Sequence, residues 1–464
     1  MSETTPWGRR AFFTILAGEA VSAIGSGLSV FGVGIWIYQR TGSVTRFSLL
    51  SLCMILPSIF LAPLAGVLVD RFDRRRIMML ANLAQFLIML SFAPLIVAGR
   101  LETWYIYAAA VVVSALGMTN ILAFNALITR LLSGQDLGRA AGLFQTITAL
   151  AGIASPLLAA VLLTVTGLQG IVLVDASTFL FALITVLLVR APFVASASTE
   201  QAPAKAGFSR SDLTYGWTYV RAHHGLLALL IFSAVMNFAI GLSGVTLTPL
   251  LLGICSPRAI GTIAAVGALG MLIGSIGVGV WGGPKRRIHG VLTFGLIMGL
   301  GFIVTGVEVS PVVIGVASCI IQFFAPITFS SNQAIWLNRT PSPVQGRVFA
   351  VRTMVQSACM PIAYLAGGPV SDRFFKPLLV AGGPLTGTVG RVLGVGPSRG
   401  LGLMFIVVGF GMLTSSVIGY LYAPLRRVDD SLPDAVDSST LAPQATCLVR
   451  SNQLEYQPAS GPIE

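Results

Sequence analysis

The sequence has very little charge. Aspartate, glutamate, lysine and arginine make up 10% of its 464 residues, whereas 55% are hydrophobic. A soluble domain needs a polar surface, so this composition excludes that class. A membrane-crossing helix needs about 20 mostly apolar residues, and the chain has room for roughly a dozen of them. We therefore expect an integral membrane protein surrounded by a lipid bilayer.

Histidine and cysteine are also scarce. The three histidines lack partners at metal-ligand spacing, and the five cysteines are scattered without metal or redox spacing. Gly277–Gly282 fits G-x-G-x-x-G, but it ends an apolar helix with no strand before it, so the dinucleotide-binding context is absent. No ATP-binding P-loop or catalytic nucleophile is visible. The sequence predicts no metal, no cofactor and no enzymatic activity.

The net charge of +12 favours a membrane orientation over a nucleic-acid partner. Nucleic-acid binding needs a clustered basic face, whereas basic loops of a membrane protein gather on its inner side. With the N-terminus inside, most of the 29 lysine and arginine residues fall in cytoplasmic segments. The glycine- and proline-rich segment 371–400 is the exception. We expect a monomer in the inner (plasma) membrane with both termini in the cytoplasm.

Alternation of long apolar and short polar segments predicts twelve membrane helices. The expected ranges are 11–38, 46–69, 76–98, 103–130, 139–165, 168–190, 224–252, 256–282, 288–307, 310–337, 347–370 and 401–422. Residues 1–190 would form an N-terminal six-helix bundle, 191–223 a cytoplasmic linker, 224–422 a C-terminal six-helix bundle, and 423–464 a disordered cytoplasmic tail. Within the linker, Leu213, Trp217 and Val220 recur at helical spacing and predict a surface helix.

Two parts of the first half recur in the second half. The basic segment Gly66–Arg76 aligns with Gly277–Arg287, where Lys285-Arg286-Arg287 match three arginines but the acidic residues are lost. The run starting at Asn125 has a counterpart starting at Asn332. Parallel repeats of this size indicate two related bundles, as in many secondary transporters.

The segment Gly66-Val-Leu-Val-Asp70-Arg71-Phe-Asp-Arg74-Arg75-Arg76 contains six charges between apolar segments. Charged side chains are costly at the bilayer centre, so this segment predicts a tight hairpin at the water interface. Its pattern, G-x-L-x-D-R-x-x-R-R, resembles the loop 2–3 signature of the major facilitator superfamily of secondary transporters. The resemblance implies an all-α membrane protein with twelve transmembrane helices in two pseudo-symmetric six-helix bundles.

The charged hairpin also predicts a conformational latch. Asp70 and the arginines could form charge-assisted bonds to helix ends in one conformation and release them in another. Asp70 lies near a helix C-terminus and needs a cationic partner, for which Arg71 and Arg139 are the nearest candidates. The alternative is that the cluster only sets the membrane topology. The predicted latch comprises Gly66, Asp70, Arg71, Arg74, Arg75, Arg139 and Arg347.

Glu19 and Asp175 lie within apolar segments, in the first and sixth predicted helices. Intramembrane carboxylates usually face a cavity or a partner, and protonation neutralises them. Both are candidate proton-coupling residues. The alternative for each is a fixed hydrogen-bonded anchor between helices, which is the stronger reading for Asp175.

In the fold that the chain resembles, the first, fourth, seventh and tenth helices line a central cavity. Amide side chains gather on three of these helices. Amides both donate and accept hydrogen bonds, which suits a neutral or zwitterionic amphiphile, although they also join helices to one another. The candidate cavity residues are Asn120, Asn125, Asn237, Gln322, Asn332 and Gln333.

Two further patterns concern the direction of transport. Ala151-Gly152-Ile-Ala-Ser155-Pro156-Leu-Leu-Ala-Ala resembles the antiporter motif G-x-x-x-G-P-x-x-G-G, with serine and alanine in place of glycines. Gly18-Glu19 with Ser22 and Gly25, and Gly346-Arg347-Val-Phe, resemble the drug and siderophore exporter branch, which includes macrolide efflux proteins and the enterobactin exporter. The resemblance implies proton-driven export of a small amphiphile by alternating access. An importer or uniporter of the same fold is the alternative, ahead of a channel or a membrane enzyme.

Overall fold

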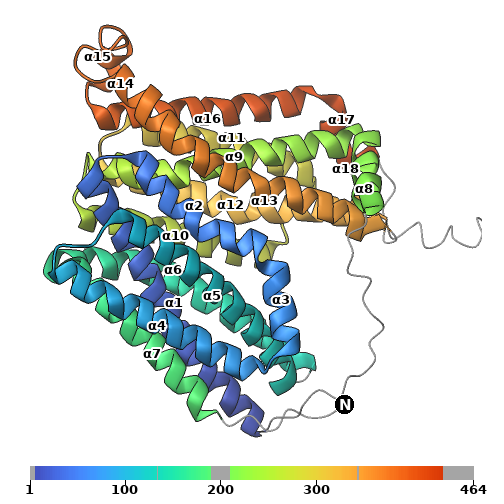
Figure 1. The fold of residues 1–464 in the computed structure, drawn as a ribbon. Coiled ribbons are helices and arrows are strands. Elements are labelled where there is room, and N and C mark those ends of the chain that lie inside the picture. The colour runs from blue at the N-terminus through green and yellow to red at the C-terminus, as the bar shows by residue number, and fades with distance from the viewer. Residues whose placement is uncertain (1–5, 133, 190–209, 342–343, 432–464) are drawn as a thin grey trace, which may run out of the picture.

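The chain is helical almost throughout the computed structural model, which describes residues 6–132, 134–189, 210–341 and 344–431 (Figure 1). The N-terminal bundle consists of α1 (Pro6–Thr41), α2 (Val44–Phe60), α3 (Ala62–Arg71), α4 (Arg74–Val97), α5 (Thr103–Leu131), α6 (Gly134–Val165) and α7 (Gly167–Leu188). The C-terminal bundle consists of α9 (His224–Leu252), α10 (Pro257–Trp281), α11 (Arg287–Val307), α12 (Pro311–Arg339), α13 (Gln345–Val370) and α16 (Pro397–Leu421). The prediction of an all-α membrane protein is confirmed.

Within the described residues, eleven helices are long and apolar enough to cross a membrane. A twelfth crossing is interrupted: α2 has 17 residues, and α3 continues it after a break at Leu61. The interruption coincides with Pro63 in the first turn of α3, because proline has no N–H to extend the helical ladder. The helix expected at 46–69 is therefore present as two segments.

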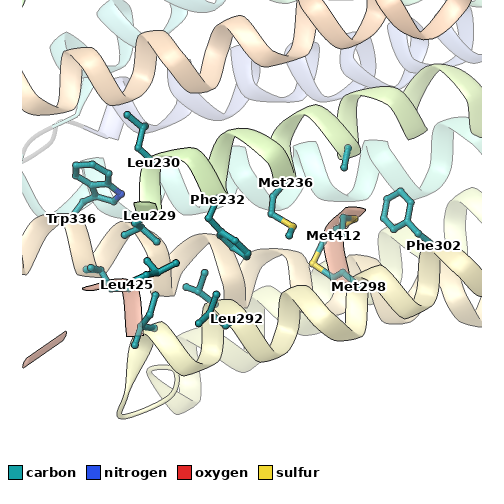
Figure 2. Packing of buried hydrophobic residues seen from close by; sticks show 14 of the residues in the cluster. Leu229, Leu230, Phe232, Met236, Leu292, Met298, Phe302, Trp336, Met412 and Leu425 are labelled. Carbon is teal, nitrogen blue, oxygen red and sulfur yellow. The ribbon is translucent and has the colours of Figure 1, made fainter. Parts of the chain in front are cut away.

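The centre of the C-terminal bundle is filled by one hydrophobic cluster (Figure 2). Phe232 and Met236 of α9 pack with Met298 and Phe302 of α11 and with Met412 of α16. Because lipid is as apolar as these side chains, the cluster stabilises the bundle through close packing and not through removal from water. The N-terminal bundle has separate apolar clusters around Phe12 and Phe92, so each bundle has its own core.

The polar segment between the bundles contains α8 (Arg210–Ala222), which agrees with the surface helix expected there. This helix packs on the start of α13, where Arg347 lies over the ring of Tyr215 at 5.2 Å. Residues 190–209, the first part of the predicted linker, lie outside the described chain.

The first residues of the predicted disordered tail are helical. They form α17 (Ala423–Arg426) and α18 (Val428–Ser431), and Leu425 and Val428 are buried. Asp429 accepts a hydrogen bond from the Ile288 N–H at 2.9 Å and so caps the start of α11. These contacts bind the segment to the C-terminal bundle, in contrast to the expectation for residues 423–431. Residues 432–464 lie outside the described chain.

The segment 371–400 contains no long helix between the end of α13 and the start of α16. It continues α13 as a π-helix, η2 (Ser371–Phe375), and then forms the short helices α14 (Lys376–Leu378) and α15 (Val389–Leu393). These helices are too short for another membrane crossing. The order of the predicted crossings is therefore retained.

The two ends of the molecule differ. We call the end with α8, α17 and the hairpin after α3 the linker end, and the end with the α1–α2 connection and α14 the loop end (Figure 1). At the loop end, Arg258 of α10 donates to the Thr164 hydroxyl of α6 at 3.3 Å. A Cβ on Gly261 of α10 would lie 2.6 Å from the Pro156 carbonyl oxygen of α6. The bundles are thus in close contact at the loop end.

Candidate transport site

A cavity of about 580 Å³ lies between the two bundles. The N-terminal bundle supplies part of its wall from α2 and α5, and the C-terminal bundle supplies the rest from α9 and α13. The lining residues include Ile55, Ser58, Ile59, Met118, Asn237, Gln356, Ser357 and Met360. Its volume and its mostly apolar wall with a few polar groups are typical of a small-molecule site.

The polar groups in this cavity come from the C-terminal bundle and from Ser58. Asn237, one of the six predicted cavity amides, is held by a bond from its Nδ2 to the Ser233 carbonyl at 2.8 Å. Gln356 and Ser357 were not predicted, because α13 is not among the four helices expected to line the cavity. The run of small and polar residues in α13 is the sequence signal that could have identified them.

Glu19 is half-buried on α1 and contacts Asn120 of α5. The Asn120 Nδ2 donates to both carboxylate oxygens, at 3.0 and 3.1 Å, whereas its own Oδ1 is buried without a hydrogen-bond partner. A protonated Glu19 would have an O–H to donate to such an oxygen after a flip of the amide. The geometry therefore accommodates both protonation states.

Asp175 lies inside the N-terminal bundle and is 1% exposed. It borders a separate cavity of about 70 Å³ with Ser26 and Ser29 of α1. The Thr178 hydroxyl donates to its Oδ1 at 3.4 Å, and the Ser29 hydroxyl of α1 lies beside the same carboxylate. Because a water needs about 10–15 Å³ of such space and polar partners, this cavity has room for water beside the carboxylate.

The other predicted amides have different surroundings. Asn332 donates to the Ser233 hydroxyl at 2.8 Å, which joins α12 to α9. Gln322 lies beside Gly267 of α10, and Asn125 is exposed on α5. Gln333 accepts a bond at 2.6 Å from Arg352. Asn332 and Gln333 therefore fit the alternative role, in which amides connect helices.

Arg352 is a buried charge that sequence reasoning did not identify. It is 4% exposed on α13 and lies 5.4 Å from the ring of Trp336 and 6.0 Å from that of Phe349. Its position four residues before Gln356 places it one helical turn from the cavity wall. A buried intramembrane cation marks a functional region by default.

The antiporter-like segment of α6 lies where α6 meets two other helices. Ser155 donates to the Ile24 carbonyl of α1 at 3.0 Å, and Pro156 meets Gly261 of α10 across the bundle boundary. Gly152, the third predicted residue, is exposed. The segment thus combines small residues and a proline at a helix–helix contact.

The charged hairpin is held within the N-terminal bundle. Arg75 donates to the carbonyls of Val186 and Leu187 at 3.1 and 2.9 Å, and so binds the C-terminal end of α7. Asp73 caps α4 by accepting the Arg75 N–H. Gly66 has no atom within 4 Å of where a Cβ would lie, and Arg71 is exposed.

Of three other predicted latch residues, the structure describes the side chain of one and not those of the other two. The side chains of Asp70 and Arg139 are not among those that the structure describes. Arg347 lies at the start of α13 against α8. The predicted ion pairs of Asp70 therefore stay predictions.

Comparison with known proteins gives a consistent result. The family model described as Major Facilitator Superfamily matches residues 15–364. Macrolide efflux protein A of Streptococcus pyogenes is 29% identical over 372 residues, which cover 78% of this chain and 89% of the relative. Multidrug efflux pump Tap of Mycobacterium bovis is 24% identical over 368 residues, or 78% of this chain and 87% of that protein.

Solved structures with the same fold include a bacterial homologue of the human lysosomal transporter Spinster, in an inward-facing and unoccupied conformation. It aligns with a TM-score of 0.68 at 15% sequence identity, covering 91% of this chain and 98% of that one. At this identity the likeness concerns the fold.

Proposed function

Because the chain belongs to the major facilitator superfamily, it is a membrane transporter and not an enzyme, and we propose that it exports a small amphiphilic molecule in exchange for protons. The observation that carries this proposal is the cavity of about 580 Å³ with walls from both bundles. A site shared by two bundles is exposed alternately to each side when the bundles rock against each other. The named efflux relatives support export.

We propose that the loop end faces the cell exterior and the linker end the cytoplasm. The bundles are in contact at the loop end, and the basic residues of the hairpin lie at the linker end, where the inner-side bias of basic loops places the cytoplasm. With this orientation, the described conformation is closed to the outside. Substrate would then enter the cavity from the cytoplasm, with both termini on the same side.

We assign proton coupling to Glu19, with Asp175 as a second protonatable group. Glu19 has a hydrogen-bonding partner for each protonation state in Asn120. Asp175 has space for water beside it and lies nearer the proposed outer side, because it follows the start of α7 at the loop end. A proton that enters from outside would therefore meet Asp175 before Glu19.

The test is transport in inside-out vesicles with an imposed proton gradient. A macrolide serves as the first probe, followed by a screen of cationic, neutral and zwitterionic amphiphiles. Glu19→Gln should abolish gradient-driven accumulation while leaving probe binding within about threefold of the unchanged protein, since the amide keeps the size but not the proton. Glu102→Gln, the same change at an exposed carboxylate outside the membrane-crossing helices, is the control. Gradient-driven accumulation in Glu19→Gln equal to that of the unchanged protein would refute the assignment.

The same vesicle assay distinguishes the role of Asp175 from that of Glu19. Asp175→Asn should reduce the number of protons moved per probe molecule and keep some gradient-driven transport. A fixed structural anchor would instead lower the amount of folded protein and leave that ratio unchanged. An importer would accumulate the probe in right-side-out vesicles under an inward proton gradient and not in inside-out ones.

A further inference from the structure

The charged hairpin of the N-terminal half has a second counterpart in the sequence, at the opposite end of the molecule. Gly368-Pro-Val-Ser-Asp372-Arg373-Phe374-Phe-Lys376 aligns without a gap with Gly66-Val-Leu-Val-Asp70-Arg71-Phe72-Asp-Arg74. The glycine, the Asp-Arg-Phe sequence and the final basic residue recur. Each segment spans the end of a membrane-crossing helix, but Asp70 lies in the last turn of α3 at the linker end, whereas Asp372 lies in η2 after α13 at the loop end (Figure 1).

In the structure, Asp372 caps a helix of the other bundle. Its carboxylate accepts the backbone N–H groups of Val44 and Thr45, at 3.0 and 2.8 Å, and the hydroxyls of Ser43 and Thr45, both at 2.7 Å. These residues form the first turn of α2. A carboxylate at this position satisfies otherwise unpaired N–H groups and complements the positive end of the helix dipole.

Lys376 strengthens the same junction. Its ammonium group lies 2.8 Å from Asp372 and donates to the Gly42 carbonyl of the N-terminal bundle, also at 2.8 Å. It also lies 5.2 Å from the centre of the Tyr38 ring of α1. The two charged residues of one bundle thus bind the α1–α2 connection of the other through charge-assisted bonds.

The two matched glycines differ in how closely other atoms approach them. A Cβ on Gly368 would lie 2.3 Å from the Ser48 hydroxyl and 2.5 Å from the Thr45 Cα, so glycine permits the helices to meet here. A Cβ on Gly66 would have no atom within 4 Å. One copy of the motif is therefore engaged with the facing bundle at its glycine, and the other is not.

We infer that Gly368, Asp372 and Lys376 form an outer latch, a second copy of the hairpin motif that holds the loop end closed, and that the first copy acts in the opposite conformation. Helix α2 packs along α13 and η2 across the bundle boundary, and α2 begins at the end of the molecule where α13 passes into η2. When the loop end opens, Asp372 leaves the start of α2. The opposite closure would bring the Asp70 segment to the start of α13, which has no side-chain cap in this structure.

This inference rests on the alternating access of the proposed function but not on the substrate or the proton. Its test uses purified protein in nanodiscs without substrate. The native cysteines are replaced, and spin labels are attached through Arg100→Cys and Val309→Cys, which occupy exposed connections at the loop end, one in each bundle. The distance distribution between the labels reports whether this end is open.

Asp372→Asn keeps the size of the side chain but removes the charge, and we expect the ratio of open to closed loop end to rise about tenfold. Thr45→Val, in the other bundle, should shift it in the same direction by a smaller factor because it removes one of the bonds. Arg373→Gln is the matched control, since Arg373 is exposed on the same turn and should leave the distribution unchanged.

Unchanged distances in Thr45→Val and in folded Asp372→Asn would overturn the inference, as would an equal shift in Arg373→Gln. If Asp372→Asn does not fold, Thr45→Val decides alone, because its change lies outside the π-helix that holds Asp372. Vesicle transport by the same variants is measured separately. If the variants shift the distances as expected but neither they nor the unchanged protein transport any probe, the result contradicts the proposed substrate or coupling and not the latch.

Discussion

Arg75 shows how one side chain of the basic hairpin stabilises its bundle. Its guanidinium group binds the last carbonyls of α7, which lack partners within that helix. We expect Arg75→Gln to lower the free energy of unfolding by about 1–2 kcal/mol, measured by thermal denaturation in detergent. Arg76→Gln is the control, because the Arg76 side chain is largely exposed and its 3.8 Å ion pair with Asp73 is screened by water. An equal loss in both variants would mean that the hairpin acts through its overall charge.

Individual residues show where reasoning from sequence stops. Glu19 could be singled out because a carboxylate in an apolar helix is costly, but its contact with Asn120 depends on how α1 and α5 are rotated. The same rotation decides that Asn237 lines the cavity while Asn332 joins two helices. Arg352 was missed because only the fold brings Trp336 and Gln333 to it.

At the scale of helices, glycine spacing controls how closely α10 packs on α12. A Cβ on Gly274 would lie 2.1 Å from the Phe323 carbonyl oxygen, whereas one on Gly277 would meet nothing within 4 Å. Gly274→Ala should therefore cost about 1–3 kcal/mol of stability through overpacking. Gly277→Ala should be neutral or stabilising by up to about 1 kcal/mol, because alanine is the better helix former.

Thermal denaturation of the two single variants side by side checks this contrast. The two changes have the same chemistry and lie one turn apart on one helix. If Gly277→Ala were as destabilising as Gly274→Ala, close packing against Phe323 would not be the reason for glycine at 274.

Helix order was predictable from hydropathy because each crossing is a long apolar segment. The features that differ from the predicted helix pattern depend on local backbone chemistry and on tertiary contacts. The interruption at Leu61 follows from the prolines around it, and the π-helix after α13 forms where Asp372 reaches the other bundle. The helices at 423–431 form because Leu425 and Val428 find an apolar surface, which composition alone does not reveal.

At the scale of the whole molecule, closure of the loop end brings α6 and α10 together. A Cβ on Gly261 would lie 2.7 Å from that of Ala160, and a disulfide needs about 3.5–4.5 Å between such atoms. A helix shift of about 1 Å would therefore allow Ala160→Cys and Gly261→Cys to join. Oxidation should stop transport and hold this end closed, and reduction should restore transport.

The control for this crosslink is each single cysteine variant under the same oxidant. Transport that continues in the fully crosslinked double variant would mean that α6 and α10 do not separate during the cycle. The sequence could not indicate which end is closed, because both conformations satisfy the same apolar pattern and differ by only a few kcal/mol.

The capping of α2 by Asp372 of the other bundle has a kinetic consequence. When Asp372 withdraws, the amide groups of Val44 and Thr45 are left at an aqueous boundary, where solvent takes over as hydrogen-bond acceptor. The same rupture in the middle of the hydrocarbon layer would leave those groups bare and cost several kcal/mol for each. Placing these charge-assisted contacts between the bundles at the rim, and not at mid-depth, therefore keeps the barrier to reopening low enough for repeated cycles.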